Sequence, residues 1–516
     1  MPKKTLSLIM LVAASAAMLA WGQEKTTPMT LEECLVRAME KNLGLQVQVL
    51  NPTMADFRVS AAGEKFLPSF SVDYSKTNNE SKATSYLEAE GLVSTVNQNS
   101  YSAGLSQFLP TGGRLRASVE TGMYNTNARY QTYNPYYSAQ VLFTLEQPLL
   151  KNFGYNISRR EILVARNNSQ IAEATYKATL LETLYSVEEA YWNLVYSIEN
   201  HKVMLESLNL ARNLLQQNKD KLAIGMLAPI EVVTAESEVA SREADILQAE
   251  VLIRNREDAL RTLLNMHADN ETDASVITPT DLPKAEKRDL ATDAALALAQ
   301  ANRPELASAQ YDISNKKLDL TWARNQLLPD LSLSAQYWSP ASSGTQILYQ
   351  DDNPLTGVII GRIPSNSGQA FKDAMKFKYK NYYVAVSLSL PLNAIFSRAQ
   401  TSVARAALEQ SQLALKNQQE QIFLEVRSAC RDVENNSKRV EAYETARKLA
   451  ERKLDAEERK ARTGLSTNYT VLQVQRDLAL AKSQELQARV DLVLSQARLD
   501  RATGTSLTRR NIKITS

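Results

Sequence analysis

Histidine and cysteine are the side chains most often used for metal binding and nucleophilic chemistry, and this 516-residue chain has two of each. His201 and His267 are not spaced as a metal-binding pair, and no cysteine accompanies either of them. Cys34 and Cys430 are far apart in sequence, and free buried thiols are the expected state of both. The sequence therefore predicts no metal site.

Motifs for other catalytic chemistry are also absent from the sequence. It contains no phosphate-binding loop, no Gly-x-Ser-x-Gly elbow and no dinucleotide fingerprint. The 59 basic and 57 acidic side chains give a net charge of +2, which offers no concentrated basic surface for nucleic acid. We predict no enzymatic activity, no cofactor and no nucleic-acid partner.

Residues 1–22 have the organisation of a secretory signal peptide. Lys3 and Lys4 precede an apolar run over 6–20, and small residues at Ala20 and Gly22 predict cleavage before Gln23. A membrane anchor is the alternative, but the run is shorter than the roughly 20 apolar residues that span a bilayer. No later stretch is long and apolar enough either. An exported chain of this kind can cross a membrane only as a closed β-barrel.

Two long stretches lack helix breakers. Neither Gly nor Pro occurs between Gly154 and Gly225, or between Pro391 and Gly464. At 1.5 Å per residue each stretch predicts a helix of about 100 Å, which requires coiled-coil-like packing and ends at a glycine. After a tight turn, a second helix is expected over 229–266 in the first case and 470–503 in the second.

The second helices carry rows of small and apolar residues that predict close helix packing. The first row is Ile230, Val233, Ser237, Ala240, Ala244, Leu247 and Val251. The second row is Val471, Val474, Leu478, Ala481, Ala488 and Leu492, interrupted by Glu485. Taken alone, these rows fit a plain helical hairpin equally well.

Four short stretches alternate between apolar and polar residues, as strands with one apolar and one Ser-rich face do. They begin near Phe70, Ala139, Leu331 and Val384. An additional hairpin is expected over 101–109 and 114–124, around the turn Pro110–Gly113, so the chain has four strands or six. The polar segments 76–100 and 339–374 are expected to be surface loops.

The order of elements occurs twice, which predicts two internal repeats. In each repeat a Leu-Pro pair, Leu67-Pro68 or Leu328-Pro329, precedes a strand. The predicted boundaries are a signal peptide over 1–22, a first repeat over 23–268, a linker over 269–287, a second repeat over 288–503 and a C-terminal tail over 504–516. Four strands cannot enclose a water-filled lumen, whereas three chains together supply twelve.

These features resemble the TolC-like outer-membrane efflux protein family over most of the chain. The resemblance lies in the segment 30–35 (TLEECL) with Ala38 and Asn42, the repeated Leu-Pro pair, Gln147-Pro148-Leu149 and the Gly464-Leu465 turn. It implies an α+β membrane protein in which a trimeric β-barrel in the outer membrane continues as a long antiparallel α-helical tunnel in the periplasm. It also implies a passive exit duct of a tripartite efflux pump or type I secretion system, docked to a periplasmic adaptor protein and through it to an inner-membrane transporter.

The resemblance also assigns roles to the two turns. The aperture at the periplasmic tip would be lined by Glu231, Thr470 and Gln473. The adaptor would contact the turns at Gly225, Met226, Leu227, Gly464, Leu465 and Ser466. Some members of the family have aspartates where Thr470 and Gln473 stand, so a wider or polar ring is expected here in place of an anionic one.

Two other classes of protein remain open on the sequence alone. An exported coiled-coil scaffold with small β modules would need no pore, and a secreted hydrolase would need a catalytic constellation that the sequence lacks. The strand faces discriminate between the first of these and a duct. A lipid-facing sheet requires an apolar band with aromatic rims, whereas a scaffold requires neither.

Overall fold

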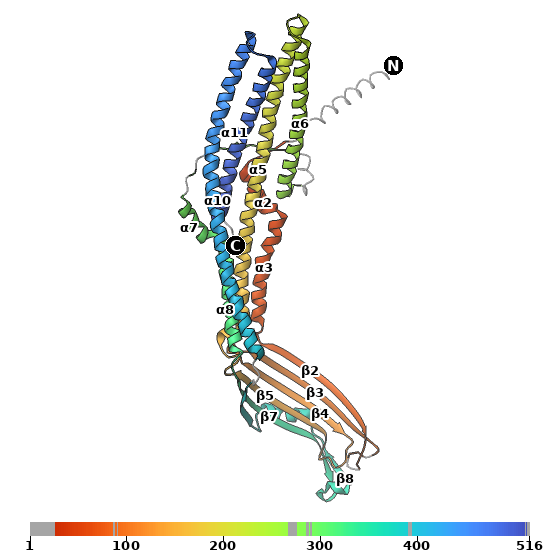
Figure 1. The fold of residues 1–516 in the computed structure, drawn as a ribbon. Helices are drawn as coiled ribbons and strands as arrows, with labels where there is room; N and C mark the ends of the chain where they lie inside the picture. The colour runs from red at the N-terminus through yellow and green to blue at the C-terminus, as the bar shows by residue number, and fades with distance from the viewer. Residues whose placement is uncertain are drawn as a thin grey trace, which may run out of the picture. The chain divides into compact units, whose positions relative to one another are not determined.

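The computed structural model describes residues 26–510 and 512, except 86–87, 90, 267–275, 285–287, 289–290 and 391–394 (Figure 1). The predicted signal peptide, His267 and part of the predicted linker lie outside these residues. The chain divides into two compact units. The helical unit comprises Met1–Pro52, Ile171–Ala309 and Ala414–Ser516, and the sheet unit comprises Thr53–Gln170 and Gln310–Leu413. Each unit takes segments from both predicted repeats.

Long helices form where the sequence lacks Gly and Pro. The two longest are α5 (Arg160–Ala223) and α10 (Ile395–Arg462), with 64 and 68 residues. Each is followed by a shorter helix, α6 (Pro229–Leu263) or α11 (Asn468–Thr503). The two predicted helical hairpins are therefore confirmed, with boundaries that shift by a few residues. None of the helices in the described ranges is long and apolar enough to cross a membrane.

The rest of the helical unit consists of shorter elements. It contains α2 (Leu31–Lys41), the first part of α3 (Leu43–Glu64), α7 (Thr292–Asn302), the first part of α8 (Pro304–Asn325) and α12 (Ser506–Arg509). Two short strands, β1 (Thr26–Met29) and β6 (Val276–Pro279), pair in parallel. β6 lies inside the segment that the sequence predicts to be a linker.

The two predicted packing rows have different outcomes. The row on α11 is buried, as predicted. The row on α6 is exposed in this chain, and the buried side of α6 is a second row at Val232, Ala235, Val239, Ile246 and Ala249. Ala235, Val239 and Ile246 pack with Leu208 and Ala211 of α5 and with Leu472 of α11. The prediction for the α6 row is therefore wrong within one chain, because α6 carries two apolar rows and packing uses the other one.

Glu485, which interrupts the row on α11, is buried and paired. Its carboxylate accepts hydrogen bonds from Arg447 of α10 and from Arg489 one turn further along α11, the latter at 2.7 Å. Burial of a carboxylate is costly unless cations and hydrogen bonds compensate its charge. The interruption is therefore a buried ion cluster that fixes α10 against α11.

The helix α2 begins with a capping box. The Thr30 hydroxyl accepts from the Glu33 backbone N–H at 3.2 Å, and the Glu33 carboxylate accepts from the Thr30 N–H at 2.8 Å. This cap directs Cys34, Leu35 and Ala38 into a cluster with residues of α5 and α6. The family-like segment 30–35 thus has a structural role, since it begins a helix and supplies its buried face.

We expect the thiol of Cys34 to be unreactive in the folded protein. The side chain is fully buried, and burial, with smaller effects of Glu33 and Asp281, raises its pKa to about 12, so very little thiolate exists at pH 8. A Cys430→Ser variant leaves Cys34 as the remaining cysteine, and Ellman's reagent should label it only after unfolding in urea. Labelling of the folded variant at the rate of a free thiol would contradict this expectation.

The sheet unit contains one seven-stranded antiparallel sheet with the order β2-β3-β4-β5-β7-β8, in which β9 also pairs with β7. The strands are β2 (Ser69–Lys82), β3 (Val93–Phe108), β4 (Arg114–Thr126), β5 (Tyr133–Pro148), β7 (Asp330–Tyr349), β8 (Ile359–Ile363) and β9 (Asn381–Ser389). The helices α4 (Tyr155–Ser158) and α9 (Ser367–Met375) and two 3-10 turns, Gln350–Asp352 and Pro354–Thr356, complete the unit.

The sheet confirms the four predicted strands and the additional hairpin, and it contains one further short strand, β8, that was not predicted. The expected additional hairpin is β3 and β4, and it is inserted in the same sheet between β2 and β5. The predicted loops over 76–100 and 339–374 are wrong in part, because β2, β3 and β7 extend into them and β8 and α9 lie within the second. Ser, Thr and Asn suggest loops, but pairing with neighbouring strands, on one side for β2 and on both sides for β3 and β7, orders these polar extensions.

Candidate functional site

One face of the sheet is apolar across six strands, β2, β3, β4, β5, β7 and β9. In the observed register, paired residues on neighbouring strands have their side chains on the same face of the sheet. This apolar face carries Phe70, Val72 and Tyr74; Tyr101, Ala103 and Leu105; Leu115, Ala117 and Val119; Val141, Phe143 and Leu145; Leu331, Leu333, Ala335 and Tyr337; and Tyr382, Val384, Val386 and Leu388. Many of these side chains are exposed, with Phe70 at 71% and Val386 at 63%.

The apolar band runs obliquely across the paired strands. On β7 it occupies Leu331 to Tyr337, and on β2 it occupies Phe70 to Tyr74. The row of paired residues that passes through Tyr74 reaches β7 at Ala341, beyond the end of the band on that strand. Strands that are tilted away from the barrel axis produce this displacement, because a band perpendicular to the axis meets each successive strand at a different residue.

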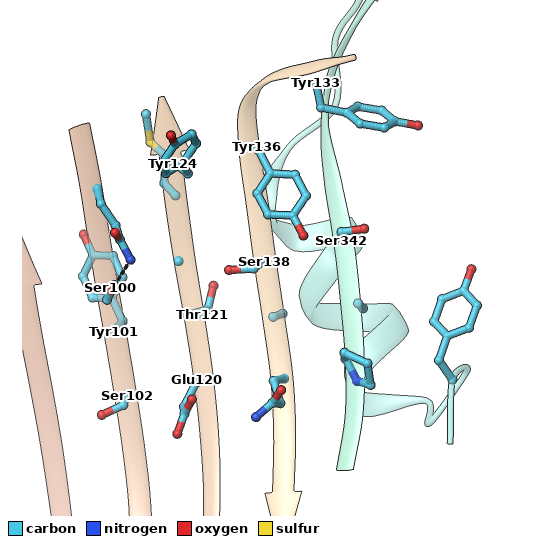
Figure 2. Close-up of a pocket in the computed structure, with 18 of the residues that line it drawn as sticks. Ser100, Tyr101, Ser102, Glu120, Thr121, Tyr124, Tyr133, Tyr136, Ser138 and Ser342 are labelled. Atoms are coloured by element: carbon cyan, nitrogen blue, oxygen red, sulfur yellow. Dashed lines mark hydrogen bonds between the residues drawn. The ribbon is translucent and has the colours of Figure 1, made fainter. Parts of the chain in front are cut away.

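The opposite face of the sheet is polar and hollowed. Figure 2 shows Ser100, Ser102, Glu120, Ser138 and Ser342 on neighbouring strands at this hollow. Its volume is about 1320 Å³, and tyrosines line one part of it. Other residues of this face are charged, among them Asp73, Arg114 and Arg116. The sheet therefore separates an exposed apolar surface from a polar concave one.

In the helical unit, both long helices end at glycines with the same geometry. Gly225 and Gly464 have φ angles of +76° and +78°, a region that favours glycine because a Cβ is strained there. The next residue reaches back in each case, with Met226 N–H to Lys221 O and Leu465 N–H to Lys460 O, both at 2.9 Å. These hydrogen bonds satisfy backbone carbonyl groups at the ends of both helices. Gly225 and Gly464, two of the six residues predicted to contact the adaptor, therefore have a structural role.

The turns expose large apolar side chains. Met226 is 74% exposed and Leu465 is 80% exposed, whereas Leu227, which follows Met226, is half-buried. Ser466 differs, because its hydroxyl donates to the Glu457 carboxylate within the same hairpin. This hydrogen bond, with the ammonium of Lys460, lowers the pKa of Glu457. Polar groups of these turns are hydrogen-bonded within the chain, while their apolar side chains remain exposed. An exposed apolar surface of this kind is suited to docking of a partner protein.

The predicted aperture residues begin the second helix of each hairpin. Glu231 is in the first turn of α6, where a carboxylate interacts favourably with the helix dipole. Thr470 donates its backbone N–H to the Thr467 hydroxyl, the N-cap of α11, at 3.2 Å. Gln473 is exposed one turn later. No hydrogen bond joins Glu231 to Thr470 or Gln473 within the described chain, so a single copy does not assemble them into one ring.

Sequence reasoning missed Arg242, which links the two hairpins. Its guanidinium is buried, donates to the backbone O and the Oγ of Ser207 in α5 at 2.6 and 3.0 Å, and pairs with Glu238 at 3.0 Å. It also donates to the Leu472 carbonyl of α11 at 3.2 Å. The only sequence signal is a cation in the inward-facing row of α6, between Val239 and Ile246.

The residues considered for metal chemistry do not converge. His201 lies in α5, with its Nε2 at 3.9 Å from Glu250 of α6. Cys34 and Cys430 are both free. In the parts of the chain that the structure describes, no three His, Cys, Asp or Glu side chains form a group able to hold a metal ion.

Comparisons with known proteins identify similar chains. The sequence profile of a family described as outer membrane efflux protein matches residues 121–266 and 295–505. Outer membrane protein TolC of Vibrio cholerae is 23% identical over 362 residues, which are 69% of this chain and 76% of that protein. Cobalt-zinc-cadmium resistance protein CzcC of Cupriavidus metallidurans is 21% identical over 254 residues, 48% of this chain and 57% of that protein.

Solved structures share the fold. The Campylobacter jejuni outer membrane channel CmeC has a TM-score of 0.66 at 15% identity and covers 94% of this chain and 90% of its own. The open state of the Neisseria gonorrhoeae outer membrane channel MtrE has a TM-score of 0.63 at 18% identity and covers 94% and 91%. The agreement extends over both units of the chain.

Proposed function

We propose, from the premise that this chain belongs to the outer membrane efflux protein family, that it is the passive exit duct of a tripartite efflux pump or type I secretion system. The observation that carries this proposal is the continuous sheet with one exposed apolar face and one hollow polar face. A wall between lipid and water requires this division, and a soluble scaffold would bury the apolar face.

Three copies would close the sheet into a barrel. One edge of the sheet is β2, and β9 and β8 lie at the other. Unpaired backbone groups are not tolerated in hydrocarbon, so β2 of one copy would pair with β9 of the next. Six strands from each of three copies give eighteen, more than the twelve that four strands per chain would supply. The number of copies in the assembly, three, is inferred from the resemblance to the family.

The exposed row on α6 supports an assembly of copies. Ile230, Val233, Leu247 and Val251 are 57% to 65% exposed and lie on the side of α6 that its own chain leaves uncovered. Ser237, Ala240 and Ala244 continue the row with small side chains that permit close approach. We infer that this row packs against the neighbouring copy, so that the hairpins of all copies together enclose a tunnel.

The duct would carry out no chemistry of its own. Energy would come from an inner-membrane transporter, coupled through a periplasmic adaptor that docks at the exposed Met226 and Leu465. We expect Leu465→Asp to abolish export by cells while the purified protein still conducts in a planar bilayer, because the charge disrupts an apolar contact outside the pore. Loss of conductance in the same variant would contradict docking as its role.

The tip residues would set the selectivity of the duct. We expect Gln473→Asp to raise the cation selectivity of the conductance, since one carboxylate from each copy would enter the narrowest part. Gln419→Asp is the matched control, because Gln419 is exposed on α10 well before the tip. Reversal potentials under a salt gradient measure the effect. Equal shifts in both variants would show that Gln473 does not line the aperture.

Conductance of the purified protein in a planar bilayer tests the proposal as a whole. A duct gives stable channels and migrates as a detergent-resistant oligomer that dissociates on heating. Recovery of the protein as a soluble periplasmic monomer without channel activity would favour the scaffold and overturn the duct.

A further inference from the structure

The helix α9 lies on the apolar face of the sheet, beside the exposed band. Its Ala370 and Ala374 are buried against Ala139 and Val141 of β5 and Ala341 of β7. Phe377 follows the helix and stacks on Tyr337 at 5.6 Å and on Phe143 at 6.2 Å, which are residues of the band. The helix and Phe377 therefore lie on the same face as the band and cover its edge on β5 and β7.

The outer side of this helix and the segment after it are basic. Residues 372–380 contain four lysines and one aspartate, a net charge of +3 in a chain whose total is +2. Lys378 pairs with Asp373 at 3.1 Å. Lys372, Lys376 and Lys380 are exposed and form no salt bridge within the described residues. Phe371 and Met375 are also exposed on α9, at 44% and 50%.

The direction of the chain places these lysines on one side of the band. β5 ends at Pro148, close in sequence to α5, and α9 covers its earlier residues Ala139 and Val141. The lysines thus lie at the edge of the band that is farther from the strand ends connected to the long helices. This step rests on the proposed function, in which those helices are periplasmic and the opposite strand ends face outward.

We propose that α9 and the segment Lys376–Lys380 form a lipid-binding surface that holds the phosphate groups of anionic lipids at the outer edge of the membrane. The adjacent band fixes the depth, since apolar side chains enter the hydrocarbon and lysines extend to the headgroup level. Phe371 and Met375 would contact the acyl chains, and the three unpaired ammonium groups would attract the headgroup phosphates.

Spin-labelled lipids test this surface in the full-length protein reconstituted in phosphatidylcholine vesicles. We expect the protein to restrict labelled phosphatidylglycerol in preference to labelled phosphatidylcholine. Lys372→Gln/Lys376→Gln/Lys380→Gln should lower this preference about fivefold or more at low salt, and the Lys→Arg triple should retain it. The matched control is Lys221→Gln/Lys317→Gln/Lys416→Gln, three exposed lysines elsewhere, which should leave the preference unchanged.

The outcomes separate this inference from the duct itself. The surface is overturned if the wild-type protein shows no preference, if the first Gln triple keeps the preference, or if both Gln triples lose it equally. It is also overturned if soluble glycerol phosphate competes as well as the lipid, because the site would then bind free phosphate. Channel conductance in pure phosphatidylcholine tests the duct independently of every one of these results.

Discussion

Arg242→Ala is expected to destabilise the helical unit by about 3 kcal/mol and to raise the resting conductance. The substitution leaves Glu238 without its cation and removes the donors to Ser207 and to the Leu472 carbonyl. Removal of one partner of a buried ion pair costs several kcal/mol, because the remaining charge is desolvated and unpaired. Since Arg242 links the two hairpins, its loss also allows them to separate. The urea midpoint of the helical circular dichroism and single-channel conductance measure the two effects.

Arg212→Ala is the matched control for this prediction. Arg212 pairs with Glu243 at 2.6 Å between the same two helices, α5 and α6, but both side chains are about half exposed. Exposed pairs of this kind contribute at most about 1 kcal/mol. An equal loss of stability in both variants would mean that the buried position of Arg242 has no special importance.

Ala103→Arg is expected to reduce sharply the amount of folded protein in the membrane. Ala103 lies on the apolar face of β3, paired with Val72 of β2 and Val119 of β4. Arginine on the lipid face of a barrel costs about 2–4 kcal/mol near the membrane centre, and every copy would contribute that cost. The amount of heat-modifiable protein in isolated membranes measures the effect. A large loss would also place the β3–β4 hairpin within the wall of the pore.

Ser102→Arg provides the control on the neighbouring residue of the same strand. Ser102 faces the polar side, where its hydroxyl donates to Asp73 at 3.2 Å, so an arginine there meets water and a carboxylate. We expect near-normal assembly of this variant. If both variants assemble normally, β3 does not face lipid, and the wall would contain fewer strands per copy.

The sequence was sufficient to predict features that depend on local rules. The absence of Gly and Pro predicted α5 and α10, and Gly225 and Gly464 predicted their ends because only a left-handed residue completes that kind of helix terminus. Strict alternation located β2, β5, β7 and β9, since a strand with two different faces requires it. These features are fixed within a few residues of sequence.

The features that could not be predicted depend on partners far away in the sequence. Whether Val232 or Val233 of α6 is buried depends on α5 and α11, and both candidate rows are apolar. The polar ends of β2 and β3 look like loops until each strand is placed beside the other. α9 was missed because it has only nine residues and lies within the polar segment 339–374, whose Ser, Asn, Gly and Pro residues predict a loop. The link through Arg242 requires three helices, and its position in the inward-facing row of α6 does not identify its partners on α5 and α11.

The open edges of β2 and β9 have a genetic consequence. Each copy would pair through β2 with one neighbour and through β9 with the other. A copy with a damaged edge would therefore prevent closure of every barrel that contains it. Such an allele would therefore be dominant over the normal gene in a cell that expresses both. An allele that yields no protein at all would be recessive, since the intact copies would still assemble with one another.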